Sequence, residues 1–200
     1  MLLSAKSSQL LLIDLQERLM PAMFEADLIL GNVSKLSKAA RMLGVPIVLT
    51  EQNPDKLGIT VSSIEGPFTE TLPKMHFDAC EEGLVEVLRE IGTPKASPNA
   101  KSVPKHLKKE PSLQRPAIVI AGVESHICVL QTALSLLEEE DLEVWVVIDA
   151  CTSRSEKSRD AAYDRLAGAG AELVTAEMVA FEWLGSAEHE LFKEVQALFK

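Results

Sequence analysis

The chain has 200 residues, a length that suits one domain with a sizeable core and is short for two. Apolar residues make up 46% and charged residues 25%, which is typical of a globular protein rather than a disordered or fibrous one. The formal net charge of -10 disfavours nucleic acids and anionic membranes as partners, because both repel an acidic surface. We therefore expect one domain over residues 1–200.

The cysteines and the N-terminus indicate a compartment. Three cysteines, Cys80, Cys128 and Cys151, form neither a disulfide framework nor a C-x-x-C pair, so a reducing environment fits best. The first apolar run, at residues 10–13, is too short for a signal peptide, and no run is long enough to cross a bilayer. The sequence predicts a cytoplasmic protein.

Helices and strands are predicted to alternate along the chain. Short apolar runs predict strands, and apolar residues three and four apart predict helices. The predicted strands cover residues 9–14, 46–50, 71–77, 117–121, 143–148 and 171–175. The predicted helices cover residues 28–43, 81–91, 127–137, 156–166 and 187–199. Residues 52–67 are predicted as a functional loop, and the Lys/Pro-rich residues 92–116 as an exposed insertion or a partner-binding loop.

This alternation predicts an α/β fold, a Rossmann-like three-layer αβα sandwich around a mainly parallel sheet of about six strands. Such sheets place their sites at the carboxyl ends of the strands. The residues expected at those ends are Asp14, Glu51, Lys74, Cys128 and Asp149. An acid, a base and a thiol should therefore meet at one edge of the sheet.

Cys128 is the candidate nucleophile. It follows a buried strand, a turn at Gly122 and the start of a helix, where the helix dipole favours an anion. We therefore expect its thiol to ionise more easily than a free cysteine, whose pKa is ~8.5. The alternative is a small buried apolar residue, which is a common place for a free cysteine.

A proton acceptor for the thiol must come from elsewhere in the chain. His126 is two residues from Cys128 on one helix, a spacing at which side chains do not face each other. His76 would share a strand face with Lys74 and stays as a reserve base. Asp14 can act as the base with Lys74 stabilising the thiolate, although a capping role for Asp14 and a surface role for Lys74 remain open.

Five segments resemble the isochorismatase-like cysteine hydrolase family. They read LLLIDLQERL, TEQNPDKLGIT, LPKMHF, GVESHICV and DACTSRSEKSRDAAYDRL, in that order, and they cover nearly the whole chain except residues 92–116. The resemblance is strongest to the branch known as isochorismatase domain proteins. It implies a catalytic triad of Asp14, Lys74 and Cys128.

The resemblance also implies the surroundings of the triad. It places a non-proline cis peptide between Val123 and Glu124, which would aim the backbone N–H of Glu124, with that of Cys128, into an oxyanion hole. We expect Gln52 and Phe77, in the matching segments, to contact the substrate, although Phe77 could equally be a core residue. The family commonly forms dimers or larger assemblies, and the apolar stripes of residues 178–184 and 187–199 could serve a homo-oligomer or pack within one subunit.

The predicted function is hydrolysis of a small-molecule carbonyl or amide through a thioester intermediate. We expect no cofactor and no metal. The metal-binding members of this superfamily hold their metal through an Asp and His cluster downstream of the first strand, and this sequence has no histidine before His76. The presence of Cys128 disfavours cleavage of isochorismate itself, since the members that cleave it lack this cysteine. Two alternatives remain: a catalytically idle or redox-regulatory protein, and an amidase of the nicotinamidase or N-carbamoyl type.

Overall fold

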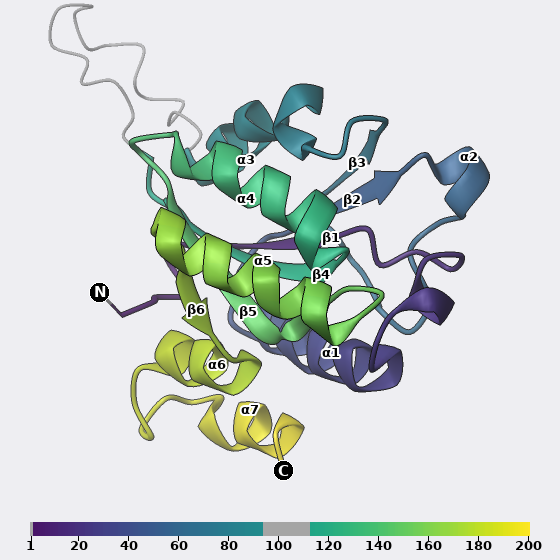
Figure 1. Cartoon of the computed structure of the whole chain (residues 1–200). Coiled ribbons are helices and arrows are strands. Elements are labelled where there is room, and N and C mark those ends of the chain that lie inside the picture. Colours follow the sequence, from purple (N-terminus) through teal and green to yellow (C-terminus); the bar gives the residue numbers. More distant parts are fainter. Residues whose placement is uncertain (1, 94–112) are drawn as a thin grey trace, which may run out of the picture.

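A computed structural model of the chain describes residues 2–93 and 113–200. Most of the predicted insertion at residues 92–116 lies outside the described residues. The rest forms one α/β unit with a central sheet and helices on both of its faces (Figure 1). No helix among the described residues is long and apolar enough to cross a membrane.

The sheet contains six parallel strands in the order β3-β2-β1-β4-β5-β6. Their bounds are β1 Ser8–Ile13, β2 Ile47–Gln52, β3 Glu70–Lys74, β4 Ala117–Val123, β5 Glu143–Thr152 and β6 Glu172–Val174. The order reverses between β1 and β4, the two central strands. Ligands of such sheets bind outside the carboxyl ends of the strands at this reversal. The prediction of an αβα sandwich with a parallel, six-stranded sheet is confirmed.

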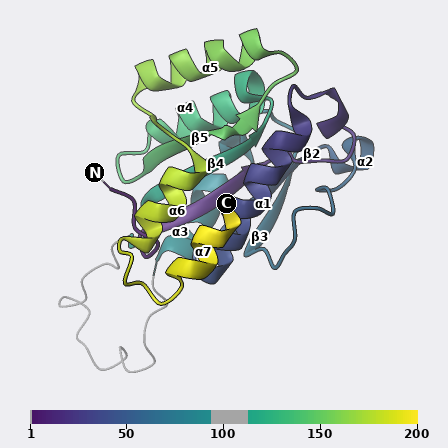
Figure 2. The same cartoon turned by 90° about the horizontal axis from the view of Figure 1, so that it is seen from below.

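Helices cover both faces of the sheet (Figure 2). The helices on one face are α1 Ala26–Met42, α6 Ala176–Leu184 and α7 Phe192–Leu198, and those on the other are α3 Leu84–Gly92, α4 Leu130–Leu137 and α5 Glu156–Ala169. The shorter pieces are α2 Pro54–Leu57, the 3₁₀ turns η1 Met20–Ala22 and η2 Ala79–Glu82, and the π-helical turn η5 Ser125–Val129.

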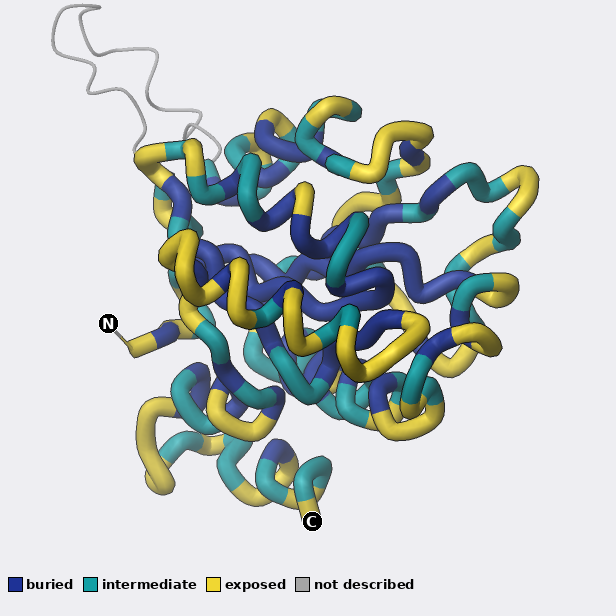
Figure 3. Tube along the Cα trace, viewed as in Figure 1, coloured by how far each residue is buried: buried dark blue, intermediate teal, exposed yellow. Residues whose placement is uncertain are grey.

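The central strands are buried (Figure 3). Successive residues along them point alternately into two hydrophobic cores, one on each face of the sheet. Leu10 and Leu12 of β1 face α1 and α6, whereas Leu11 and Ile13 face α3 and α4. This explains why the strand reads as a continuous apolar run with no polar alternation. The apolar side of α7 packs against α1 and α6 around Val195, so this stripe is used within one subunit.

Several predicted boundaries are wrong. β5 continues to Thr152 through a bulge in its pairing with β4, so Asp149 lies inside the strand rather than at its end. The predicted helix 81–91 is interrupted at Gly83, whose positive φ separates η2 from α3. The last helix covers only Phe192–Leu198 of the predicted 187–199, and the predicted loop 52–67 contains α2.

Gly122 lets the two central strands approach each other beside the carboxyl edge. It has a φ of 151°, and a Cβ placed on it would lie 2.3 Å from the carbonyl oxygen of Ile13. That distance is far below a van der Waals contact, and the atom it would meet belongs to the backbone of β1. Only glycine fits without moving β1 away from β4.

Replacing this glycine tests the close approach. We expect Gly122→Ala to lower the free energy of unfolding by about 3 kcal/mol, since it adds both a clash and backbone strain. The matched control is Gly31→Ala, an exposed site within α1 with no atom within 4 Å of the new Cβ, which should raise it by about 0.5–1 kcal/mol. Chemical denaturation measures both, and equal effects of the two changes would contradict this view of the strand contact.

Candidate active site

A buried ion pair lies at the carboxyl edge of the sheet. The Lys74 Nζ, from the end of β3, is 2.9 Å from the Asp14 Oδ2, from the end of β1, and both side chains are fully buried. β2 separates these two strands, so Lys74 reaches across it. A buried charge is tolerated only beside an opposite charge, and here Lys74 and Asp14 are each other's partner. The predicted meeting of these two side chains is therefore seen in the fold.

The Lys74 ammonium is held by further acceptors. It donates to the Oε1 of Gln52 at 2.6 Å and lies within 3.3 Å of the carbonyl oxygens of His76 and Phe77. A lysine has three N–H donors, so these four acceptors, Asp14 included, fully occupy it. The ammonium is consequently fixed in place and oriented toward the carboxylate.

Asp14 has one oxygen in a regular hydrogen bond and one available. Its Oδ1 accepts a hydrogen bond from the Thr50 hydroxyl at 2.7 Å. Its Oδ2 is buried and close to Lys74, but no hydrogen bond of regular geometry reaches it from the described residues. A lone pair on Oδ2 is therefore available to a neighbouring proton donor.

Cys128 is that neighbour. It lies in the π-helical turn η5 that follows β4, it is 3% exposed, and its thiol is close enough to Asp14 and Lys74 for both charges to act on its pKa. Burial raises the pKa of the Cys128 thiol well above its ordinary value, and the Asp14 charge raises it further, while Lys74 opposes this only in part. The expectation of an easily ionised thiol is therefore wrong, because desolvation outweighs the lysine. The raised pKa favours the neutral thiol of Cys128 beside the Asp14 carboxylate.

Strained backbone marks the same edge of the sheet. Four non-glycine residues in the described part of the chain have a positive φ: Asp14, Asn53 and Glu124 directly after β1, β2 and β4, and Glu25 at the start of α1. This conformation is costly for residues with a Cβ and clusters at functional sites. Three neighbouring strands thus end in a left-handed residue where the triad gathers.

The predicted cis peptide between Val123 and Glu124 is not present. Among the described residues the cis peptide bond is Gly66–Pro67, and the chain instead reverses after β4 through the left-handed conformation of Glu124, with a φ of 56°. The carbonyl of Glu124 accepts from the N–H groups of Ile127 and Val129. Its own N–H donates to no acceptor in the described part of the chain. The turn therefore presents a free backbone donor without a cis bond.

The two predicted substrate contacts have different surroundings. Both ends of the Gln52 amide are used within the protein, since the Oε1 accepts from Lys74 and the Nε2 donates to the carbonyl of Met75 at 2.8 Å. Gln52 therefore positions Lys74, and a substrate contact stays a prediction. The Phe77 side chain is 52% exposed, so it is not a core residue and is free to meet a ligand.

Other candidates from the sequence lie away from the triad. Glu51 accepts two hydrogen bonds from Thr60 and fixes the following loop. Asp149 accepts from the N–H of Ala176 at the start of α6. His76 pairs with Glu82 and has an exposed ring, which disfavours its reserve role as a base.

Three side chains of the site were not predicted from the sequence. Thr50 bonds Asp14, Gln16 exchanges hydrogen bonds with the Gln52 backbone, and Arg154 lies 3.0 Å from Glu124. Each contact joins residues far apart along the chain, and only the strand order brings them together. For Thr50, the parallel register of β1 and β2 could have given a hint, because it places the ends of these two strands side by side.

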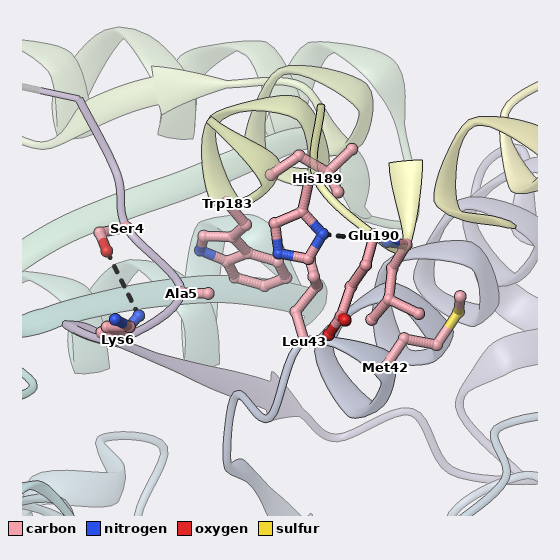
Figure 4. A pocket seen from close by; sticks show the side chains of 10 residues that line it. Ser4, Ala5, Lys6, Met42, Leu43, Trp183, His189 and Glu190 are labelled. Carbon is pink, nitrogen blue, oxygen red and sulfur yellow. Dashed lines mark hydrogen bonds between the residues drawn. The ribbon is translucent and has the colours of Figure 1, made fainter. Parts of the chain in front are cut away.

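No three His, Cys, Asp or Glu side chains of the described residues are grouped as metal ligands are, and the absence of a metal stays a prediction. A hollow of about 450 Å³ lies at the opposite, amino edge of the sheet, beside Lys6, Leu43, Trp183 and Glu190 (Figure 4). Asp14, Lys74 and Cys128 are not among the residues that line it.

Comparison with known proteins agrees with this architecture. The family model of the isochorismatase domain matches residues 8–178. The chain belongs to the isochorismatase domain family. Isochorismatase domain-containing protein 2 of Bos taurus is 36% identical over 194 residues, covering 97% of this chain and 83% of that protein.

Solved structures of the isochorismatase fold superpose on nearly the whole chain. The MAR1 ribonuclease of Caenorhabditis elegans has a TM-score of 0.82 at 31% identity, covering 99% of this chain and 92% of that one. The YcaC gene product of Escherichia coli, described as an octameric hydrolase of unknown specificity, has a TM-score of 0.80 at 26% identity, covering 99% and 89%. The predicted family and fold are both confirmed.

The raised pKa of Cys128 in this isochorismatase-family site predicts how alkylation depends on pH. Only the thiolate reacts, so labelling by iodoacetamide should stay slow at pH 7 and rise only above the ~8.5 of a free cysteine. Asp14→Asn removes a charge that raises the pKa, so it should speed labelling at pH 8, whereas Lys74→Met should slow it further. Peptide mass spectrometry measures the labelled fraction of Cys128.

A Cys80→Ala background removes the other half-buried thiol from this measurement. Circular dichroism must show that each variant is folded. Rapid labelling of Cys128 at pH 7 in the unsubstituted protein, or slower labelling in Asp14→Asn, would contradict the electrostatics described above.

Proposed function

We propose that this protein is a cysteine-dependent hydrolase that cleaves a small-molecule carbonyl compound, with an amide as its first candidate, through Asp14, Lys74 and Cys128. The observation that carries the proposal is the buried Lys74–Asp14 pair, with an Asp14 oxygen open to the Cys128 thiol. A nucleophilic cysteine needs an acceptor for its proton and a cation for its thiolate, and this arrangement offers both. Membership of the isochorismatase family is consistent with a hydrolase.

The first half of the reaction forms a thioester. The Asp14 Oδ2 takes the thiol proton, and the thiolate, beside the Lys74 ammonium, attacks the substrate carbonyl carbon to give a tetrahedral oxyanion. As this collapses, the C–N bond breaks, Asp14 returns the proton to the leaving nitrogen, and ammonia or an amine departs. The acyl group remains on the Cys128 sulfur.

The second half of the reaction releases the acid. A water enters the place of the leaving group, Asp14 takes its proton, and the resulting hydroxide attacks the thioester carbonyl. The C–S bond then breaks, the sulfur takes the proton from Asp14, and a carboxylic acid leaves. Asp14 therefore acts alternately as base and acid, which suits a carboxylate held beside a fixed ammonium.

Backbone donors would stabilise the oxyanion in both halves. The N–H of Glu124 is the best supported of these, because it follows β4 directly and no other described residue accepts it. The N–H of Cys128 is proposed as the second. Loss of one such donor in another hydrolase costs about 3–4 kcal/mol of transition-state stabilisation.

The proposed substrate is small and the proposed reaction needs no cofactor. Cys128 is only 3% exposed, so a bulky substrate could not bring its carbonyl to the sulfur. The net charge of -10 disfavours a nucleic acid, although one structural relative is a named ribonuclease. A homo-oligomer is part of the proposal, supported by the octameric YcaC relative.

A panel of small amides and N-carbamoyl compounds tests the proposal. We expect at least one member to release ammonia and to leave a transient acyl mass increment on Cys128. Cys128→Ala should lose both signals completely, and Cys80→Ala, the matched change of a cysteine outside the triad, should keep them. Ammonia release and intact-protein mass spectrometry after rapid quenching measure the two signals.

The competing readings give different results. An idle scaffold releases nothing and forms no adduct with any member of the panel. A redox protein forms a reversible Cys128 oxidation product without ammonia release. Turnover that persists in Cys128→Ala would contradict the proposed mechanism outright.

A further inference from the structure

Glu124 is a buried acid beside the triad whose side chain the reaction above does not use. It is 8% exposed, and its Oε1 lies 3.0 Å from the Nε of Arg154, a residue of the segment between β5 and α5. Its Oε2 is buried and has no hydrogen bond in the described part of the chain, with the His126 Nδ1 3.5 Å away. A buried charge held by one arginine is costly and calls for a reason.

The backbone of Glu124 is costly as well. Its left-handed conformation suits glycine or asparagine, and a glutamate at this position carries strain. Glycine would remove that strain, but it would also remove the carboxylate. Two unfavourable features therefore meet at one residue that directly follows a central strand and precedes the turn carrying Cys128.

The contacts of Glu124 hold this turn from two sides. Its carbonyl accepts from the N–H groups of Ile127 and Val129, at 2.8 and 3.3 Å, which fixes the turn internally. Its carboxylate fixes the turn externally through Arg154. A second external contact runs parallel, from the His126 Nδ1 to the Ser153 hydroxyl at 2.9 Å.

The Ser153–Arg154 side of these contacts is itself anchored. The carbonyl of Ser153 accepts from the N–H of Phe24 at 2.8 Å, and the neighbouring Thr152 hydroxyl donates to the carbonyl of Phe24. The segment after β5 is thus tied to the chain that follows β1. It offers a firm support against which the Glu124 turn can be held.

We propose that the Glu124 carboxylate is a positioning residue that, clasped by Arg154, holds the left-handed turn so that the backbone N–H of Glu124 faces the developing oxyanion. This inference rests on the proposed hydrolase function. The carboxylate touches no reacting atom. Its effect is geometric, because a donor misplaced by even 1 Å stabilises the transition state much less.

Kinetics of the Glu124 and Arg154 variants test the role in catalysis, with the amide that proves best in the panel as substrate. We expect kcat to fall by ~10-fold in Glu124→Gln and by ~100-fold in Glu124→Ala, relative to the unsubstituted protein. Glutamine keeps one acceptor for Arg154, whereas alanine keeps none. KM should change by less than ~3-fold, because the lost interaction acts in the transition state. Glu140→Gln, an exposed acid on the loop after α4, is the matched control and should change neither constant.

A second variant guards against misfolding of a protein changed at a buried site. The Arg154 side chain is 58% exposed, so Arg154→Ala should fold while releasing the clasp. Its loss of kcat should match that of Glu124→Ala, and the double variant should be no worse than either single one. If Arg154→Ala and the unsubstituted protein have equal unfolding midpoints but unequal kcat, the loss of activity comes from positioning and not from stability.

Amide hydrogen exchange in the absence of substrate decides the inference independently of turnover. We expect the N–H groups of residues 124–128 to exchange faster in Arg154→Ala than in the unsubstituted protein, with no change in the distant strand β6. Unchanged exchange, or unchanged kcat in an active enzyme, overturns the inference. If the unsubstituted protein hydrolyses no member of the panel, the proposed function fails and the catalytic role of the clasp fails with it, even where exchange becomes faster.

Discussion

The site depends on one interaction, the ion pair between Lys74 and Asp14 inside the protein. Neither side chain touches water, so each charge is tolerable only because the other is 2.9 Å away. The pair also sets the state of the sulfur beside it. Burial raises the pKa of the Cys128 thiol, the Asp14 carboxylate raises it further, and the Lys74 ammonium opposes this only in part. Stability and proposed chemistry thus rest on the same two groups.

The fold supplies what this pair requires. Lys74 and Asp14 come from strands separated by β2, and Cys128 comes from the far side of β1, so only the order β3-β2-β1-β4 places them together. Gly122 permits the close approach of β1 and β4, and left-handed residues turn the chain away from the edge at Asp14, Asn53 and Glu124. The strain at these turns is offset by the two cores on either face of the sheet, which hold the strands in register.

Much of this could be predicted from the sequence, because strand ends are a property of local pattern. Asp14 ends an apolar run, and the parallel-sheet rule brings such residues to one edge. Lys74 was predicted inside a strand of residues 71–77, whereas β3 ends at Lys74 itself. The same rule gave a wrong position for Asp149, because a bulge prolongs β5 beyond it and no local sequence pattern shows that bulge. The prediction that the Cys128 thiol ionises easily was also wrong, because the position of Cys128 near a helix start can be read from the sequence, whereas its desolvation cannot. The clasp of Glu124 by Arg154 depends on tertiary packing alone.

Unfolding free energies of Asp14→Asn, Lys74→Met and the double variant test the central claim most directly. If the buried charges sustain each other, each single change should cost about 3–5 kcal/mol, and the double variant should cost clearly less than their sum. The exposed pair of Arg89 and Asp141 gives the control, where coupling should be about 1 kcal/mol or less. Additive losses at Asp14 and Lys74 would contradict the account, because they would mean that neither charge needs the other.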